Sequence, residues 1–159
     1  MAVWQFKVIL VPKRWLDAGG AIAALVSEDG WDTASAWRGI DGVALQGRIE
    51  GILPRGRSWY PEVFIWGSEQ GSDIQLSLEN ARVESLGIRF DLRNPDMQLF
   101  RAVFRLAEEC GLVILDLARK CALPDLNGLI RAAAESDAAH FVLDPASFLA
   151  QVLTNARAT

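Results

Sequence analysis

The sequence predicts an α+β protein, with a mixed or antiparallel sheet and about three helices packed mainly on one face. Two patterns carry this prediction. Several short segments alternate apolar and polar residues, as half-buried strands do. Three later segments repeat apolar residues at helical spacing and begin at capping residues. At 159 residues without an internal repeat, the chain is expected to form a single domain over residues 1–159.

The first predicted strand covers residues 3–11 and ends at Pro12, which cannot donate to a sheet. Both of its faces carry apolar residues, so we expect it to be covered on both sides near its end. A short strand is predicted at 63–66, and alternating runs follow at 73–78 and 86–92. The last two are joined by a short polar link, which predicts an antiparallel pair with one face toward solvent.

The helical pattern is clearest in residues 95–110. Asn94 is predicted to cap this helix and Gly111 to close it. An apolar strand follows at 112–117. The order strand, helix, strand predicts a crossover that places strands 86–92 and 112–117 parallel in one sheet.

Two further helices are predicted at 125–136 and 145–156, and residues 141–143 are expected to be a short apolar link or strand. Residues 13–57 are punctuated by glycine, so long regular elements are not expected there. Within this segment, residues 21–26 suit a short helix or a strand, and residues 43–53 suit either as well.

The net charge narrows the classes of partner. Sixteen basic and twenty acidic residues give a charge of −4. The first 66 residues carry as many acidic as basic side chains, so the excess lies in the second half. An acidic chain is a poor match for a phosphate backbone, which makes nucleic acid an unfavoured partner, and it is compatible with a basic protein.

The sequence predicts no metal site and no cofactor. Its two cysteines, Cys110 and Cys121, have one histidine to help them and lack the spacing of a zinc site. They are interpreted as reduced thiols of a cytoplasmic protein. The first residues, MAVWQFKVILVPKRW, lack the pattern of an export signal, and no apolar run reaches the length of a membrane span.

The sequence also predicts no catalytic residue. Any general base must be His140, the only histidine, and its neighbours Ser136 and Asp137 lie about one helical turn away. Such spacing seldom gives the geometry of a nucleophile and a base. We therefore do not expect an enzyme, and we expect any activity to survive the loss of His140.

Tryptophan is distributed unevenly. All six tryptophans and the single tyrosine lie between Trp4 and Trp66. The sequence predicts a partner-binding surface formed by aromatic anchors and nearby carboxylates. The predicted members are Asp29, Trp31, Asp32, Trp37 and Trp59. The alternative is that these indoles fill space over the sheet, with each N–H on a backbone carbonyl.

A second segment, PRGRSWY, combines Arg55 and Arg57 with Trp59 and Tyr60. Arginines beside stacking aromatic rings are typical of single-strand binders. This loop keeps open the alternative of a nucleic-acid or small-ligand binder. A small enzyme with an unrecognised active site is the other alternative.

Three segments carry a resemblance to a known class of proteins. They are GIRFDLR at residues 87–93, CGLVI at 110–114 and SDAAHFVLDP at 136–145. They resemble small uncharacterised bacterial proteins associated with the immunity proteins of toxin systems, over the C-terminal half of the chain. The resemblance implies a single acidic domain that neutralises a toxin by direct binding, with a basic toxin domain as its partner. The oligomeric state is left open, a homodimer included.

Overall fold

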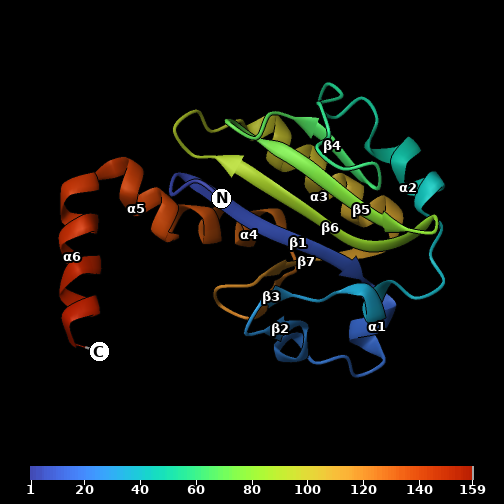
Figure 1. Cartoon of the computed structure of the whole chain (residues 1–159), viewed down its shortest axis with the longest axis horizontal. Helices are drawn as coiled ribbons and strands as arrows, with labels where there is room; N and C mark the ends of the chain where they lie inside the picture. The colour runs from blue at the N-terminus through green and yellow to red at the C-terminus, as the bar shows by residue number, and fades with distance from the viewer. Residues whose placement is uncertain (159) are drawn as a thin grey trace.

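The computed structural model, which describes residues 1–158, has a six-stranded sheet as its centre (Figure 1). The strands lie in the order β4 (Val63–Gly67), β5 (Asp73–Glu79), β6 (Arg82–Asp91), β1 (Gln5–Pro12), β7 (Leu112–Asp116) and β8 (Cys121–Leu123). Every neighbouring pair is antiparallel. The predicted α+β class is confirmed, and the sheet is antiparallel rather than mixed.

Strand β1 is the first strand of the chain and lies inside the sheet. It pairs antiparallel with β6 on one side and with β7 on the other. Strands β6 and β7 are therefore parallel to each other, as the predicted crossover requires, but β1 lies between them. Helix α3 (Met97–Cys110) makes the connection.

Helices α2 (Gly42–Ile49), α3 and α4 (Leu126–Ala134) contribute to the main core on one face of the sheet. We call this side the core face. Phe100 of α3 lies flat on Phe90 of β6, with ring centroids 4.2 Å apart and an interplanar angle of 2°. Aromatic rings in offset stacks of this kind add to the stabilisation that burial alone provides.

The start of α3 differs from the prediction by two residues. Asp96, rather than Asn94, caps the helix: its Oδ1 accepts from the backbone N–H of Gln98 at 2.9 Å and of Leu99 at 3.3 Å. Its extended backbone (φ −112°, ψ 103°) places Pro95 outside the helix. The predicted end is confirmed, because Gly111 adopts the left-handed conformation, with φ 63°.

The glycine-rich segment forms short elements. They are α1 (Lys13–Asp17), the 3₁₀ helix η1 (Ile22–Leu25), β2 (Val26–Ser27), β3 (Gly30–Trp31) and a second 3₁₀ helix, η2 (Ala34–Trp37). The ambiguous residues 43–53 are mostly the helix α2, which Asp41 caps through the N–H of Val43 at 2.9 Å.

Part of this segment covers the end of β1 on the face opposite the core face. A second apolar cluster there joins Ile9 and Val11 of β1 to Leu115 of β7 and to Leu25 and Ala36 of the glycine-rich segment. The prediction that β1 is covered on both faces near its end is therefore confirmed.

The C-terminal helices differ most from the prediction. Residues 141–143 were expected to be a link or strand, but they end helix α5 (Asp137–Leu143), which Ser136 caps through the N–H of Ala139 at 3.2 Å. Helix α6 (Pro145–Ala158) packs mainly against α5 and stands away from the sheet (Figure 1). Among residues 1–158, no helix is both long and apolar enough to cross a membrane.

Candidate functional site

The face of the sheet opposite the core face is only half covered. Its register places polar side chains in rows across the strands. Lys7 of β1 lies opposite Arg89 of β6, which lies opposite Asp73 of β5. The next row contains Ile9, Gly87 and Gln75 in the same order. Ile9 belongs to the second apolar cluster, whereas Lys7, Gln75, Gly87 and Arg89 are only partly buried. We call the part of the sheet around these four residues the open face.

Three adjoining hollows lie on and beside the open face. The first, which we call the lysine hollow, has a volume of about 360 Å³. Its floor is formed by Lys7, Gly87 and Arg89, together with Gln75, Ser77 and Ser85, and its wall by Asp29, Gly30, Trp31 and Thr33.

The second hollow, also of about 360 Å³, is called here the acidic hollow. Its lining includes Trp31 and Tyr60 as well as four carboxylate residues, Asp32, Glu62, Glu79 and Glu84. Asp32, Glu79 and Glu84 also line the next hollow along, where Arg38 and Arg82 face them. Within residues 1–158, neither arginine forms an ion pair with these carboxylates.

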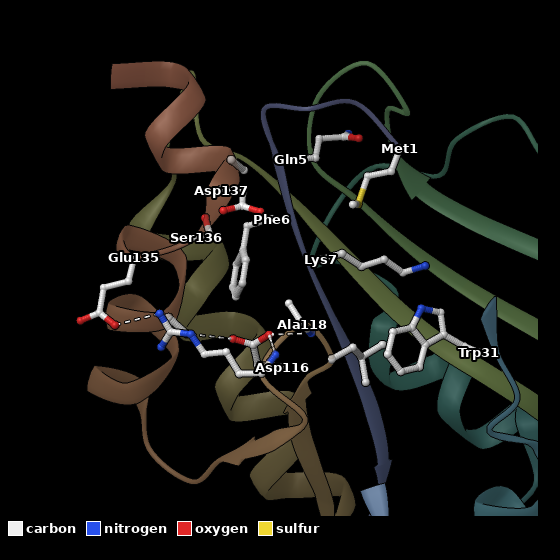
Figure 2. A pocket seen from close by; sticks show the side chains of 14 residues that line it. Met1, Gln5, Phe6, Lys7, Trp31, Asp116, Ala118, Glu135, Ser136 and Asp137 are labelled. Carbon is white, nitrogen blue, oxygen red and sulfur yellow. Dashed lines mark hydrogen bonds and ion pairs between the residues drawn. The ribbon is translucent and has the colours of Figure 1, made fainter. Parts of the chain in front are cut away.

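The third hollow, of about 420 Å³, lies at the N-terminal end of β1 and is called the apolar hollow (Figure 2). Its apolar lining comprises Met1, Phe6, Leu117, Ala118, Ala132 and Ala138. Figure 2 shows Phe6 on one side of β1 and Lys7 and Trp31 together on the other. Three of its charged side chains are paired with one another. Arg119 donates from Nη2 to Glu135 Oε2 at 2.8 Å, and its Nε lies 3.8 Å from Asp116 Oδ2.

Trp31 lines all three hollows. It ends the short β2–β3 hairpin, where it pairs with Val26. The segment after it is fixed to the sheet by Thr33, which is buried and whose Oγ1 donates to the carbonyl of Glu84 at 2.7 Å. The hairpin therefore holds the indole, which is 39% exposed, at the edge of the open face.

The charged row of the open face is built around one buried carboxylate. Arg89 donates from Nε to Asp73 Oδ1 at 2.8 Å and from Nη2 to Oδ2, and Gln75 Nε2 donates to Oδ2 at 3.0 Å. Asp73 is fully buried and Arg89 is 14% exposed as a side chain. This paired geometry is the strong form of an arginine–carboxylate contact.

The ammonium group of Lys7 lies beside this pair and forms no ion pair among residues 1–158. Burial lowers the pKa of its ammonium group below the usual 10.5, and the neighbouring Arg89 lowers it further, while Asp73 acts in the opposite direction.

The acidic hollow shows the opposite effect on a carboxyl group. Burial raises the pKa of Glu84, and a hydrogen bond and charge repulsion from Glu79, with repulsion from Asp32 and Glu62, raise it further. The four carboxylates of this hollow therefore repel one another where Glu84 lies.

The structure places the predicted partner-binding residues in different environments. Trp37 is 1% exposed and belongs to the main core, so its predicted role as a surface anchor is wrong. Asp29, Trp31 and Asp32 are exposed together at the β2–β3 hairpin. Trp59 is 68% exposed and lies beside Tyr60, with ring centroids 6.3 Å apart.

For Trp37, the alternative is right that the indole fills space in the core but wrong that its N–H is on a backbone carbonyl. Nε1 of Trp4, Trp37 and Trp66 is buried and has no hydrogen-bond partner within the described part of the chain. These indoles are held by packing alone; for Trp4, packing includes the guanidinium of Arg93, 4.1 Å from a ring centroid.

Within the arginine and aromatic loop, Arg55 is held by neighbouring side chains. Arg55 is held between Glu50, at 2.8 Å, and the rings of Phe64 and Trp66, each 4.8 Å from its guanidinium carbon. Arg57, Trp59 and Tyr60 are exposed. Arg55 is exposed as well, but its guanidinium group is already engaged by Glu50 and the two rings.

His140 is exposed on α5, and Cys110 and Cys121 are free thiols packed partly into the main core. Among residues 1–158, no three residues of histidine, cysteine, aspartate or glutamate are grouped as metal ligands would be.

The sequence places Tyr60 only in the arginine and aromatic loop, and it assigns none of Lys7, Glu62, Glu79 and Glu84 to a candidate site. The alternation of β1, β5 and β6 already directs Lys7, Arg89 and Gln75 to one face. The sequence did not show that the glycine-rich segment covers only part of this face, so these residues could not be identified as a site. Comparisons with protein-family models, curated proteins and solved structures found no match.

Proposed function

We propose that the protein is a non-enzymatic protein-binding module whose partner docks over the acidic hollow, against Trp31. The observation that carries this proposal is the position of Trp31, an exposed indole held on the wall of that hollow by a hairpin fixed to the sheet. Tryptophan is the side chain most enriched among residues that dominate binding energy.

The chemistry of the partner follows from the carboxylates around the indole. Asp32, Glu62, Glu79 and Glu84 line the hollow with Trp31 and Tyr60, so a lysine or arginine side chain of a partner would meet opposite charge there. Burial and repulsion raise the pKa of Glu84, so its ionised carboxylate destabilises the folded protein at neutral pH. A basic partner surface would relieve this repulsion.

In its specific form, the proposal is that of an immunity-type protein of the bacterial cytoplasm, which neutralises a basic toxin domain by covering it. The acidic chain and the resemblance of its C-terminal half support this form. The gene directly upstream is then expected to encode a large multidomain toxin, and the last domain of that toxin is the partner to test.

The test is a calorimetric titration of that toxin domain with the wild type, Trp31→Ala and Glu62→Gln/Glu84→Gln. We expect each variant to weaken binding by at least about tenfold, which corresponds to ~1.4 kcal/mol. Because burial and the neighbouring carboxylates both disfavour the charged form of Glu84, the charge variant is expected to be at least as stable as the wild type. Its weaker binding therefore cannot be attributed to unfolding.

The matched control is Glu108→Gln/Glu109→Gln, which removes the same charge from the exposed side of α3. It should leave the dissociation constant within about twofold. Equal losses in both double variants would mean that only net charge matters, and unchanged binding in Trp31→Ala would remove the proposed docking surface. An upstream gene without a toxin would rule out the immunity form.

A further inference from the structure

The open face contains a cation that its neighbours do not neutralise. Lys7, Arg89 and Asp73 form one cross-strand row with two positive charges and one negative charge. Both carboxylate oxygens of Asp73 are occupied by Arg89 and Gln75. The ammonium group of Lys7 is therefore left beside an ion pair that is already complete.

A partly buried charge without a close partner is costly, and a ligand of opposite charge would reduce that cost. The charged groups beside Lys7 in the sheet are Arg89 and Asp73, and Asp29 and the N-terminal residue Met1 line the same hollow. Asp29 is exposed on the hairpin, so water competes with Lys7 for its carboxylate.

The space next to Lys7 suits a flat group. Gly87 lies on the floor of the lysine hollow, and a Cβ at this position would lie 3.4 Å from Lys7 Cε. The aliphatic part of Lys7 therefore lies over this glycine, between Gln75 and Ile9. Trp31 forms the facing wall, and Figure 2 shows its indole next to the Lys7 side chain. A planar ring can stack on this indole.

The polar groups of the floor add donors for oxygen atoms. The hydroxyl groups of Ser77 and Ser85 line the same hollow and make no side-chain hydrogen bond within residues 1–158. The ammonium group of Lys7, which has three N–H donors, can bind the two oxygens of a carboxylate. The volume of about 360 Å³ lies in the range of small-molecule sites.

We propose that the lysine hollow binds a small planar organic acid, with its carboxylate on Lys7 Nζ and its ring against Trp31. This site adjoins the acidic hollow, where the protein partner is proposed to dock, and the two hollows share Trp31, Thr33, Ser77 and Ser85 in their linings. Of the two hollows, Lys7 lines only the first, and the four carboxylates Asp32, Glu62, Glu79 and Glu84 line only the second.

The test uses four probes in calorimetric titrations, benzoate, 2-naphthoate, indole-3-carboxylate and the neutral indole-3-carboxamide. We expect at least one of the acids to bind with a dissociation constant of about 1 mM or tighter, and the amide to bind at least about tenfold more weakly. Amide chemical shifts of Gly30 and Gly87 should move with the acid, because both residues line the hollow.

Lys7→Met removes the charge and keeps the length of the side chain. It is expected to weaken binding of the acid by at least about tenfold, whereas Lys13→Met, at an exposed lysine outside the hollow, should leave it unchanged. Trp31→Ala should weaken the binding of both the acid and the amide. Equal affinity of wild type and Lys7→Met for the acid, or no saturable binding of any of the acids at ~5 mM, would overturn the proposal.

The two proposals fail separately. Glu62→Gln/Glu84→Gln should weaken binding of the protein partner and leave binding of the acid unchanged. Lys7→Met should weaken binding of the acid and leave binding of the protein partner unchanged. Loss of both ligands in the same charge variant would contradict the assignment of two sites.

Discussion

The same strands form both faces of the sheet, but the side chains that they contribute to each face differ in kind. On the core face, β1, β5 and β6 contribute only apolar side chains, and α2, α3 and α4 cover them. On the open face, the same strands contribute Lys7, Asp73 and Arg89 in one row, and the glycine-rich segment covers only part of them. The core face is stabilised by the burial of apolar side chains. On the open face, stability depends on which charged side chains form ion pairs.

This difference predicts how each face responds to substitution. Removal of apolar volume from the core face leaves a cavity, and the cost grows with burial. On the open face the sign depends on the residue: a side chain that neutralises a charge stabilises the fold, and one that adds an unpaired charge destabilises it.

The largest effect is expected from Phe100→Ala on the core face. Phe100 is 3% exposed and stacked on Phe90, so its removal should lower the free energy of unfolding by about 3–5 kcal/mol. Phe104, on the same helix, is only partly buried, and Phe104→Ala should cost about 1–2 kcal/mol. Urea unfolding of both variants measures the difference, and equal losses would mean that the two sides of α3 are assigned incorrectly.

A somewhat smaller loss is expected from Asp73→Asn on the open face. The substitution keeps the shape of the side chain and leaves Arg89 and Lys7 without their counter-charge. Breaking a buried ion pair in this way should cost about 2–4 kcal/mol in urea unfolding. A cost below ~1 kcal/mol would show that water, rather than Asp73, solvates Arg89 on this face.

The core face is also the part that could be predicted from the sequence. Alternation fixes the inward side of β5 and β6, and helical spacing fixes the inward side of α3, because both patterns depend only on local geometry. The insertion of β1 between β6 and β7 could not be predicted, since it joins residues about 80 to 100 positions apart for which no local pattern exists.

The candidate site could be predicted only in part for a related reason. Composition indicated the tryptophan-rich half, but Trp37 and Trp31 lie in similar glycine-rich sequence, and only the fold separates a core residue from an exposed one. Their environments depend on η2 packing beside β6 while the β2–β3 hairpin stops at the edge of the open face.

Lys7→Met should have the opposite sign from Asp73→Asn. Burial and Arg89 lower the pKa of Lys7 in the folded protein, so the unfolded chain, with a pKa near 10.5, binds this proton more tightly. The charged lysine therefore destabilises the fold at neutral pH, and Lys7→Met should be more stable than the wild type at pH 7.

The pH dependence provides the control for this prediction. As pH rises from the lowered pKa to 10.5, the wild type loses the penalty and its free energy of unfolding should approach that of Lys7→Met. The quantity to measure is the difference between the two proteins, since other groups titrate equally in both. A difference that stays constant from pH 7 to 10.5 would show that Lys7 acts through packing and not through its charge.

The smallest effects on stability are expected from the two exposed indoles, and they separate a binding surface from a structural one. Trp59 is 68% exposed and Trp31 39% exposed, so Trp59→Ala should change the free energy of unfolding by less than ~0.5 kcal/mol and Trp31→Ala by about 1 kcal/mol. If Trp31 is held for binding, its truncation should weaken ligand or partner far more than it weakens the fold. Urea unfolding of both variants, compared with the titrations above, measures this ratio. A loss of 3 kcal/mol or more in Trp31→Ala would place the indole among the structural residues of the β2–β3 hairpin, and the open face would then lose its proposed anchor.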